Sequence, residues 1–189
     1  MITGEFYLQG VMEVGSGFRF NTDSTFDFFF IYGAVDRFGK GTFQQQGDSL
    51  ILHSPPKPER DFVLQSEKAT ADDNIVIRIS DPNPMILPYI VCRVKTPDGV
   101  LEGQCDQQGY IVLDKAPVQA ISLVHAFFAE RFSVFNIAQP EHNLFEFTID
   151  PRIVEVEFNG IVLHYQDGVL SGRHPLLDPM KEYRFVKNN

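Results

Sequence analysis

The run TFDFFFIY at Thr25–Tyr32 constrains the fold more than any other part of the chain. Every residue in it except Asp27 is aromatic or β-branched, and the run lacks helix caps, so it predicts a strongly apolar β-strand. Short apolar runs recur along the chain between turn residues such as Gly47 and Asp48, which we expect to join strands at 42–46 and 49–53. The pattern predicts an all-β protein with at most one or two short helices.

Phenylalanine is the dominant aromatic residue, with 18 copies in a chain that has no Trp. A phenyl ring buries a large apolar area and has no polar atom to satisfy, so these residues predict an aromatic interior. If the strands close into a barrel that holds a ligand, we expect a cavity lined by some of Phe18, Phe20, Phe26, Phe28, Phe30 and Phe43.

Two proline-rich segments punctuate the chain. The segment 55–58 has three prolines in four residues, which cannot lie inside a sheet, so we expect an exposed connection there. The segment 81–84 has two more prolines, and we place the boundary between two β-modules there. Near the end of the chain, Asn159-Gly160 is a strong turn signal that predicts a hairpin between strands at 154–158 and 161–165.

Several short patterns resemble known families. The first 80 residues resemble lipocalin-like domains of bacterial proteins of unknown function, although this chain has Phe43 where those domains usually have Trp. The resemblance is carried by Phe18-x-Phe20, Phe26-x-Phe28-Phe29, Tyr32-Gly33-Ala34-x-Asp36-Arg37, Gly41-Thr42-Phe43 and Leu50-x-Leu52-x-Ser54. The middle of the chain looks like a carboxypeptidase-regulatory-like or transthyretin-like β-sandwich, on Asp98-Gly99, Gly103, Asp106-x-x-Gly109 and Tyr110-x-Val112.

Together the resemblances imply a lipocalin-like barrel part at 1–82 and 151–189, with a β-sandwich part at 83–150 inserted between its early and late strands. The alternative is two consecutive β-domains divided near residue 83. Residues 117–131 have a polar arc with helical periodicity, yet the sandwich family has a strand at this place, so we prefer a strand slightly.

The formal net charge of -9 and the absence of a run of Lys and Arg exclude nucleic acid as a partner, because phosphate binding needs a basic face. No stretch has the roughly 18 apolar residues that a transmembrane helix needs. Residues 1–10 lack the pattern of a signal peptide, so the chain as written predicts a cytoplasmic protein. The alternative is a periplasmic or secreted protein from which a signal was removed.

The two cysteines, Cys92 and Cys105, flank a predicted hairpin turn at 96–99 and come close to opposite each other when the hairpin folds. In a chain without a signal sequence we expect two reduced, half-buried thiols. The alternative is a cross-strand disulfide.

The candidate ligand-binding residues lie around the strongest strand. Tyr32, Asp36 and Arg37 stand between that strand and a Gly-rich turn, where they would orient a small ligand at a barrel mouth, with Phe28 and Phe43 below them. The structural alternative is that Asp36 caps the turn, Arg37 pairs with an acid and Tyr32 closes the core.

No nucleotide-binding, hydrolase or metalloprotease motif occurs, so we expect no cofactor, no metal site and no catalysis. The sequence therefore predicts a non-catalytic β binding module for a small apolar or amphipathic ligand or a protein partner. One alternative is a structural module that interacts through its sandwich. The other is a hydrolase, which would need two or more of five titratable residues in one pocket: Asp36, Arg37, His53, His164 and His174.

Overall fold

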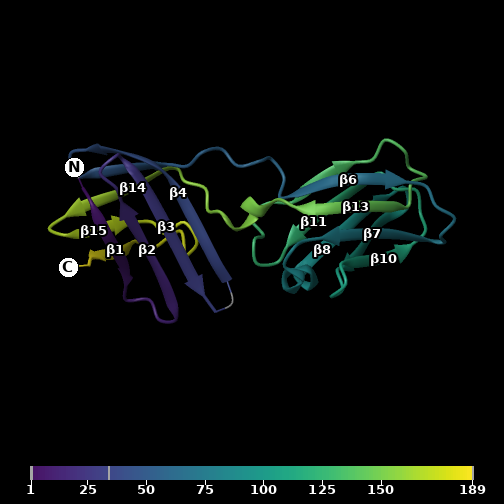
Figure 1. Cartoon of the computed structure of the whole chain (residues 1–189), viewed down its shortest axis with the longest axis horizontal. Helices are drawn as coiled ribbons and strands as arrows, with labels where there is room; N and C mark the ends of the chain where they lie inside the picture. The colour runs from purple at the N-terminus through teal and green to yellow at the C-terminus, as the bar shows by residue number, and fades with distance from the viewer. Residues whose placement is uncertain (1, 34, 189) are drawn as a thin grey trace. The chain divides into compact units, whose positions relative to one another are not determined.

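The computed structural model describes residues 2–33 and 35–188 and confirms that the protein is all-β. The chain forms two compact units, which are described separately (Figure 1). The barrel unit runs from the N-terminal end to Lys57 and resumes at Val154, whereas the sandwich unit is Pro58–Ile153. Among the described residues, no helix is long and apolar enough to cross a membrane.

The barrel unit is a closed antiparallel barrel of eight strands. Each strand pairs with the next one in the chain, β5 pairs with β14, and β16 closes the ring by pairing with β1. This up-and-down order needs only short hairpin connections apart from the one long excursion between β5 and β14. The strands are β1 (Gly4–Gln9), β2 (Val14–Phe20), β3 (Thr25–Tyr32), β4 (Val35–Gln46), β5 (Ser49–His53), β14 (Asn159–Gln166), β15 (Val169–Gly172) and β16 (Tyr183–Lys187).

Alternation along the strands directs the phenylalanines inward. In β3, Phe26, Phe28 and Phe30 are buried while Asp27 and Ile31 are exposed, as the two-residue period of a strand requires. The same alternation in the other strands builds an aromatic core. Nine of the described phenylalanines belong to it: Phe6, Phe18, Phe20, Phe26, Phe28, Phe30, Phe43, Phe158 and Phe185.

The predicted hairpin at Asn159-Gly160 is wrong. Both residues belong to β14, where the register against β5 shifts between Asn159 and Ile161, so Gly160 is the extra residue of a β-bulge. Gly160 has a φ of 72°, and a glycine in this left-handed conformation serves a bulge as well as a turn. Most of the preceding predicted strand is irregular chain, from which Phe158 enters the core.

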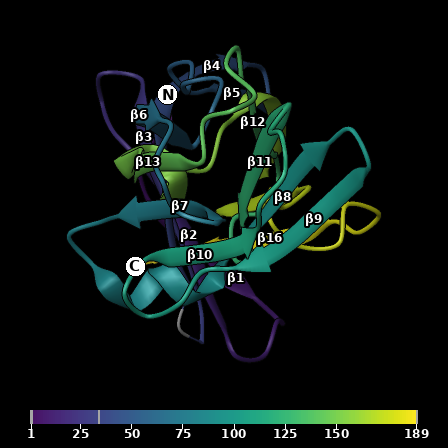
Figure 2. The same cartoon turned by 90° about the vertical axis from the view of Figure 1, so that its right-hand side faces the viewer.

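The sandwich unit has two four-stranded sheets, which confirms the second half of the predicted fold class. One sheet has the order β10-β7-β13-β6 (Figure 1) and the other β12-β11-β8-β9, which Figure 2 shows from another side. The strands are β6 (Phe62–Lys68), β7 (Asn74–Ser80), β8 (Ile90–Thr96), β9 (Gly99–Gln104), β10 (Tyr110–Asp114), β11 (Ala120–His125), β12 (Ser133–Asn136) and β13 (Leu144–Ile149). The 3₁₀ helices are η1 (Pro84–Tyr89) and η2 (Pro151–Val154).

The strand preferred at 117–131 is confirmed in β11. Ile121, Leu123, Val124 and His125 are all buried, so both faces of this strand are covered toward its end. A strand buried on both sides loses its alternation, which is why the sequence also fitted a helix.

The first boundary between the units lies at Lys57/Pro58, whereas we placed it after residue 82. The strands β6 and β7 pair with β13 inside the sandwich unit instead of extending the barrel. The proline-rich segment 55–58 is therefore the connection between units, and the later prolines include the one that begins η1. The return to the barrel at Val154 is three residues later than the position we predicted.

An ion pair between a buried carboxylate and a partly exposed arginine fixes the start of the sandwich unit. Arg131 holds the carboxylate of Asp61 with two hydrogen bonds, of 3.0 Å from Nε and 2.5 Å from a terminal guanidinium nitrogen. The backbone N–H of Asp61 donates to the hydroxyl of Ser133 at 2.8 Å, and its carbonyl accepts from the N–H of Asp150 at 2.9 Å. Asp61 is only 5% exposed, so its charge depends on Arg131 for compensation.

Candidate functional site

Phenyl rings occupy the interior of the barrel. The ring centroid of Phe18 lies 4.9 Å from that of Phe28 and 5.0 Å from that of Phe185. Phe158 lies 5.0 Å from Phe26 and 5.2 Å from Phe28, so rings from several strands meet in the middle. These separations are those of packed aromatic pairs. An eight-stranded barrel is just wide enough either to be filled by side chains or to hold one small ligand, and here the core phenylalanines pack against one another inside it.

Glycines show how tight this packing is. A side-chain carbon added to Gly39 of β4 would lie 2.5 Å from the ring of Phe158. Gly39 therefore leaves the space that the ring of Phe158 takes. Of the predicted ligand-binding residues, Phe28 is 3% exposed and Phe43 is 4% exposed, and both belong to this core.

The structure does not bring Tyr32, Asp36 and Arg37 together as one polar cluster. Asp36 is exposed on the outer side of β4, whereas Arg37, the next residue, points inward and is 4% exposed. The guanidinium of Arg37 donates to the backbone carbonyls of Val154 at 3.1 Å and Glu155 at 3.4 Å. Tyr32 is 52% exposed at the end of β3, and the turn residue Ala34, part of the family resemblance, lies outside the described residues.

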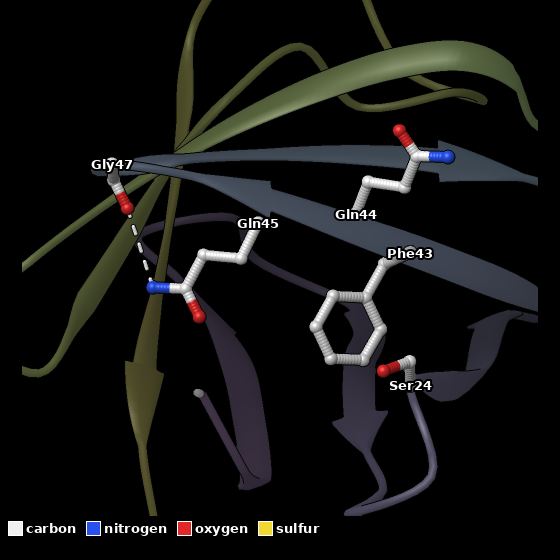
Figure 3. A pocket seen from close by; sticks show the side chains of 5 residues that line it. All are labelled: Ser24, Phe43, Gln44, Gln45 and Gly47. Atoms are coloured by element: carbon white, nitrogen blue, oxygen red, sulfur yellow. Dashed lines mark hydrogen bonds between the residues drawn. The ribbon is translucent and has the colours of Figure 1, made fainter.

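An open depression of about 510 Å³ lies at one end of the barrel, lined by Ser24, Phe43, Gln44, Gln45 and Gly47. In Figure 3 the Gln44 side chain points away from the Phe43 ring, and that of Gln45 turns toward Gly47. The amide of Gln45 is already engaged, since Nε2 donates to the carbonyl of Gly47 at 3.3 Å and Oε1 accepts from the N–H of Ile2 at 3.0 Å. The Gln45 side chain therefore has little hydrogen-bonding capacity left for a ligand in this depression.

Ser16 and His174 form a buried pair that resembles part of a catalytic site in composition but not in hydrogen bonding. Both residues are 3% exposed, and Ser16 Oγ lies 2.9 Å from Nε2 of His174. The hydroxyl of Ser16 donates to the carbonyl of Phe29 at 2.9 Å, and the N–H of Leu176 donates to Nδ1 of His174 at 3.1 Å. Nε2 must therefore carry the imidazole proton and donate it to Ser16.

This direction of donation is opposite to the one a nucleophilic serine needs, because a base must accept the serine proton. Burial lowers the pKa of His174 to about 4, so the imidazole stays neutral at physiological pH. The pair is a structural network that links β2, β3 and the segment before β16.

The remaining titratable candidates are dispersed. Arg37 and His174 both lie near Phe30, but they bond to different partners inside the barrel unit. His53 and His164 are exposed, and His164 is paired with the hydroxyl of Ser49. Within residues 2–33 and 35–188, no group of three or more His, Cys, Asp or Glu side chains is arranged to hold a metal ion.

Cys92 and Cys105 are both free and buried in the sandwich unit. Cys92 lies directly across from Gly103, so Cys105, just past the end of β9, is two residues further along the chain. Burial raises the pKa of Cys92 to about 12 and that of Cys105 to about 11. The thiolate is the reactive form of cysteine, and both thiols are therefore held in their unreactive form.

We expect both thiols to react with a maleimide at pH 7.5 at least about 100-fold more slowly in the folded protein than in denaturant. Labelling followed by mass spectrometry over time measures the two rates. Val100→Cys is the matched control, because Val100 is 58% exposed on the same hairpin, and its thiol should label at the rate of a free peptide. Fast labelling of either native cysteine in the folded chain would contradict the burial described above.

The outer side of the barrel sheet carries an apolar row of residues that sequence analysis missed. Phe38 of β4 pairs with Phe29 of β3, which pairs with Gly17 of β2, which pairs with Tyr7 of β1. Phe38 is 54% exposed and Tyr7 36% exposed. We call Phe38, Phe29, Gly17 and Tyr7 the aromatic row.

The aromatic row is continuous across its glycine. A side-chain carbon on Gly17 would lie 2.9 Å from the ring of Phe29, so this ring covers the glycine. The Phe29 ring also meets that of Tyr7 edge to face, with centroids 6.0 Å apart. Ile31, two residues beyond Phe29 on the same face, is 48% exposed and widens the apolar surface. The sequence signal for this row was the apolar residues at alternate positions of β3, which face outward when the other positions face the core.

Comparison of the chain with protein-family models, curated proteins and solved structures finds no match. The fold alone therefore defines the class of protein. It is an eight-stranded up-and-down barrel with a β-sandwich inserted between its fifth and sixth strands.

Proposed function

We propose that this protein is a non-catalytic β binding module that binds a protein partner on the outer surface of its barrel unit. The observation that carries the proposal is the aromatic row, which exposes Phe38 and Tyr7 and joins them through the half-buried ring of Phe29 that covers Gly17. Contiguous apolar patches on a soluble domain are typical of interaction sites. Aromatic residues are also the type enriched where proteins meet.

The interior of the barrel supports this choice over uptake of a small apolar ligand. The side chains predicted to line a cavity pack against one another at van der Waals distances, so a ligand would have to displace them. The buried Ser16–His174 pair has the donor direction of a structural network, which supports a function without catalysis.

We further propose that the barrel unit is related to bacterial lipocalin-like domains, and the sandwich unit to carboxypeptidase-regulatory-like or transthyretin-like domains. The up-and-down order of eight strands supports the first relation, since lipocalin barrels share it. In this view the chain keeps the barrel as a scaffold and has lost the ligand cavity.

A dye-binding experiment tests where apolar compounds bind. We expect an anilinonaphthalene sulfonate dye to bind weakly to the folded chain, and the substitutions Phe38→Ser and Ile31→Ser to reduce its fluorescence at least about threefold, since they remove exposed apolar surface. A long-chain fatty acid should not displace the dye. The control is Val162→Ser, because Val162 is 41% exposed on β14, away from the aromatic row.

The opposite result would be one dye molecule per chain, displaced by the fatty acid and indifferent to the substitutions at Phe38 and Ile31. Such a result would mean that the barrel opens to take up a ligand, and the proposed function would be wrong.

A further inference from the structure

We propose that the outer face of β1–β4 binds the same face of a second copy of this chain, around a two-fold axis that runs parallel to the strands between β2 and β3. The inference rests on the proposed function and names its partner. It starts from a second row of outward side chains beside the aromatic row, which we call the charged row.

The charged row crosses the same four strands in register. Lys40 of β4 lies opposite Asp27 of β3, Asp27 lies opposite Arg19 of β2, and Arg19 lies opposite Glu5 of β1. All four side chains are exposed. Their charges therefore alternate as plus, minus, plus and minus across the face.

This order is self-complementary under one symmetry operation. A two-fold rotation about an axis parallel to the strands leaves the position of each row along the strands unchanged. The same rotation reverses the order of the strands across the face. With the axis between β2 and β3, β4 of one copy faces β1 of the second copy, and β3 faces β2. Lys40 then faces Glu5 of the second copy, and Asp27 faces Arg19 of the second copy, so all four contacts join opposite charges.

The apolar residues match under the same rotation. Phe38 faces Tyr7 of the second copy, and the two Phe29 rings, which each lean over Gly17, meet close to the axis. Ile31 faces Gly15 of the second copy, which is exposed and has no side chain to obstruct it. Two sheets that pack face to face in this way bury their apolar rows together.

The charge of the whole chain favours a second copy over a different protein. The formal net charge is -9, which makes two copies repel each other over most of their surface. The charged row, in contrast, has two positive and two negative residues and is neutral. To bind a different protein that is uniformly positive or negative, this face would need side chains of the opposite charge. The alternating charges of the charged row instead match the same row on a second copy of the chain.

The face is small, so the dimer should be weak. Four strands about 4.8 Å apart and three rows about 6.8 Å apart span at most roughly 400 Å² per copy, about half of a standard interface, because the closed barrel curves away at β1 and β4. We expect a dissociation constant in the micromolar range, on the order of 10–100 μM.

Sedimentation of the full chain over a range of concentrations tests the inference. We expect a concentration-dependent monomer–dimer equilibrium in the wild type. Asp27→Arg and Arg19→Asp should each weaken self-association at least about tenfold, because each places like charges across the axis. The control is Lys181→Glu, an exposed charge change in the segment before β16, which should leave the dimer unchanged.

Mixing the two variants gives the decisive measurement. Across the axis, the arginine introduced at position 27 of the first variant would face the aspartate introduced at position 19 of the second. The native Arg19 of the first would likewise face the native Asp27 of the second. The mixture should therefore form a heterodimer with nearly wild-type affinity, although each variant alone stays monomeric. Circular dichroism of each variant establishes that it is folded, and recovery on mixing cannot come from charge pairs within one chain.

Three results would overturn the inference. They are a wild-type monomer at millimolar concentration, a dimer indifferent to both reversals, and a mixture that remains monomeric. If the wild type is a monomer at millimolar concentration and its aromatic row is also protected from chemical labelling, another part of the same chain covers this face. A monomer whose Phe38 and Ile31 still bind the dye would overturn this inference alone and leave the proposed function standing, so the two fail separately.

Discussion

We expect the substitution Arg131→Met to lower the free energy of unfolding of the sandwich unit by about 3 kcal/mol. The methionine fills much of the space of the arginine stem, but it leaves the carboxylate of Asp61 buried without its two hydrogen bonds from the guanidinium. Loss of one partner of a buried pair is far more costly than loss of the pair, because the remaining charge has no compensation.

Amide hydrogen exchange in β11 and β13 measures this change for the sandwich unit by itself. Adding Asp61→Asn to Arg131→Met should recover part of the lost stability, since the carboxamide is neutral. Arg93→Met is the control, because Arg93 and Glu102 form an exposed pair whose side chains are 54% and 59% exposed, and the cost should stay below about 1 kcal/mol. An equal cost for the two arginine substitutions would refute the importance of the buried pair.

The second large effect is a loss of barrel stability in mild acid that depends on His174. Burial holds the pKa of His174 at about 4 in the folded chain, whereas an unfolded histidine titrates near its ordinary value of about 6.5. Above pH 6.5 both states are neutral and the residue contributes no pH dependence. Between pH 6.5 and 4 the unfolded state binds the proton and the folded state does not, so stability falls by about 3 kcal/mol over this range and then levels off.

The surroundings of His174 explain why the folded state resists protonation. The ring is packed against Phe28, Phe30, Tyr183 and Phe185 with centroids 5.5–6.0 Å apart. The Nδ1 atom accepts from the N–H of Leu176, so a second ring proton would point at another donor. Arg37, which lies opposite Phe30 in the sheet, is also positive and cannot stabilise a protonated His174.

The measurement is barrel stability against pH in the wild type and in His174→Gln. The variant should have a flatter profile between pH 6.5 and 4.5, whatever its stability at pH 7, and His164→Gln should keep the wild-type slope because His164 is exposed. If His174→Gln does not fold, the imidazole resonances of the wild type decide. A His174 midpoint near 6.5 in the folded protein would refute the argument.

The all-β class could be predicted from the local sequence pattern. In strands such as β3 and β13, residues that face the core alternate with residues that face outward, which gives the sequence a two-residue period. The arrangement of the candidate site could not be predicted from the local sequence pattern. Asp36 and Arg37 are adjacent in sequence, and adjacency in a strand sends side chains to opposite faces, so a cluster of the two was excluded once β4 was extended through both. The aromatic row depends on the register of four strands, which no single strand specifies.

Turn signals gave mixed predictions: the hairpins at Gly47-Asp48 and at 96–99 are confirmed, whereas other turn residues serve different structures. Asn159-Gly160 supplies a left-handed glycine to a bulge, and Pro84 begins a 3₁₀ helix instead of dividing two modules. Whether β6 and β7 pair with β13 or continue the barrel is decided by contacts about 70–90 residues away in sequence. Local propensity does not carry such long-range information.

The insertion of the sandwich unit between β5 and β14 sets an order of events on the ribosome. Five of the eight barrel strands are synthesised first, but the ring cannot close until β14–β16 have followed, after the whole of Pro58–Ile153. At about 5–20 residues per second, the nascent chain carries an open, phenylalanine-lined sheet for at least about 5–20 seconds. The sandwich unit is complete in sequence before the barrel is, so the last-made strands close the first-made domain.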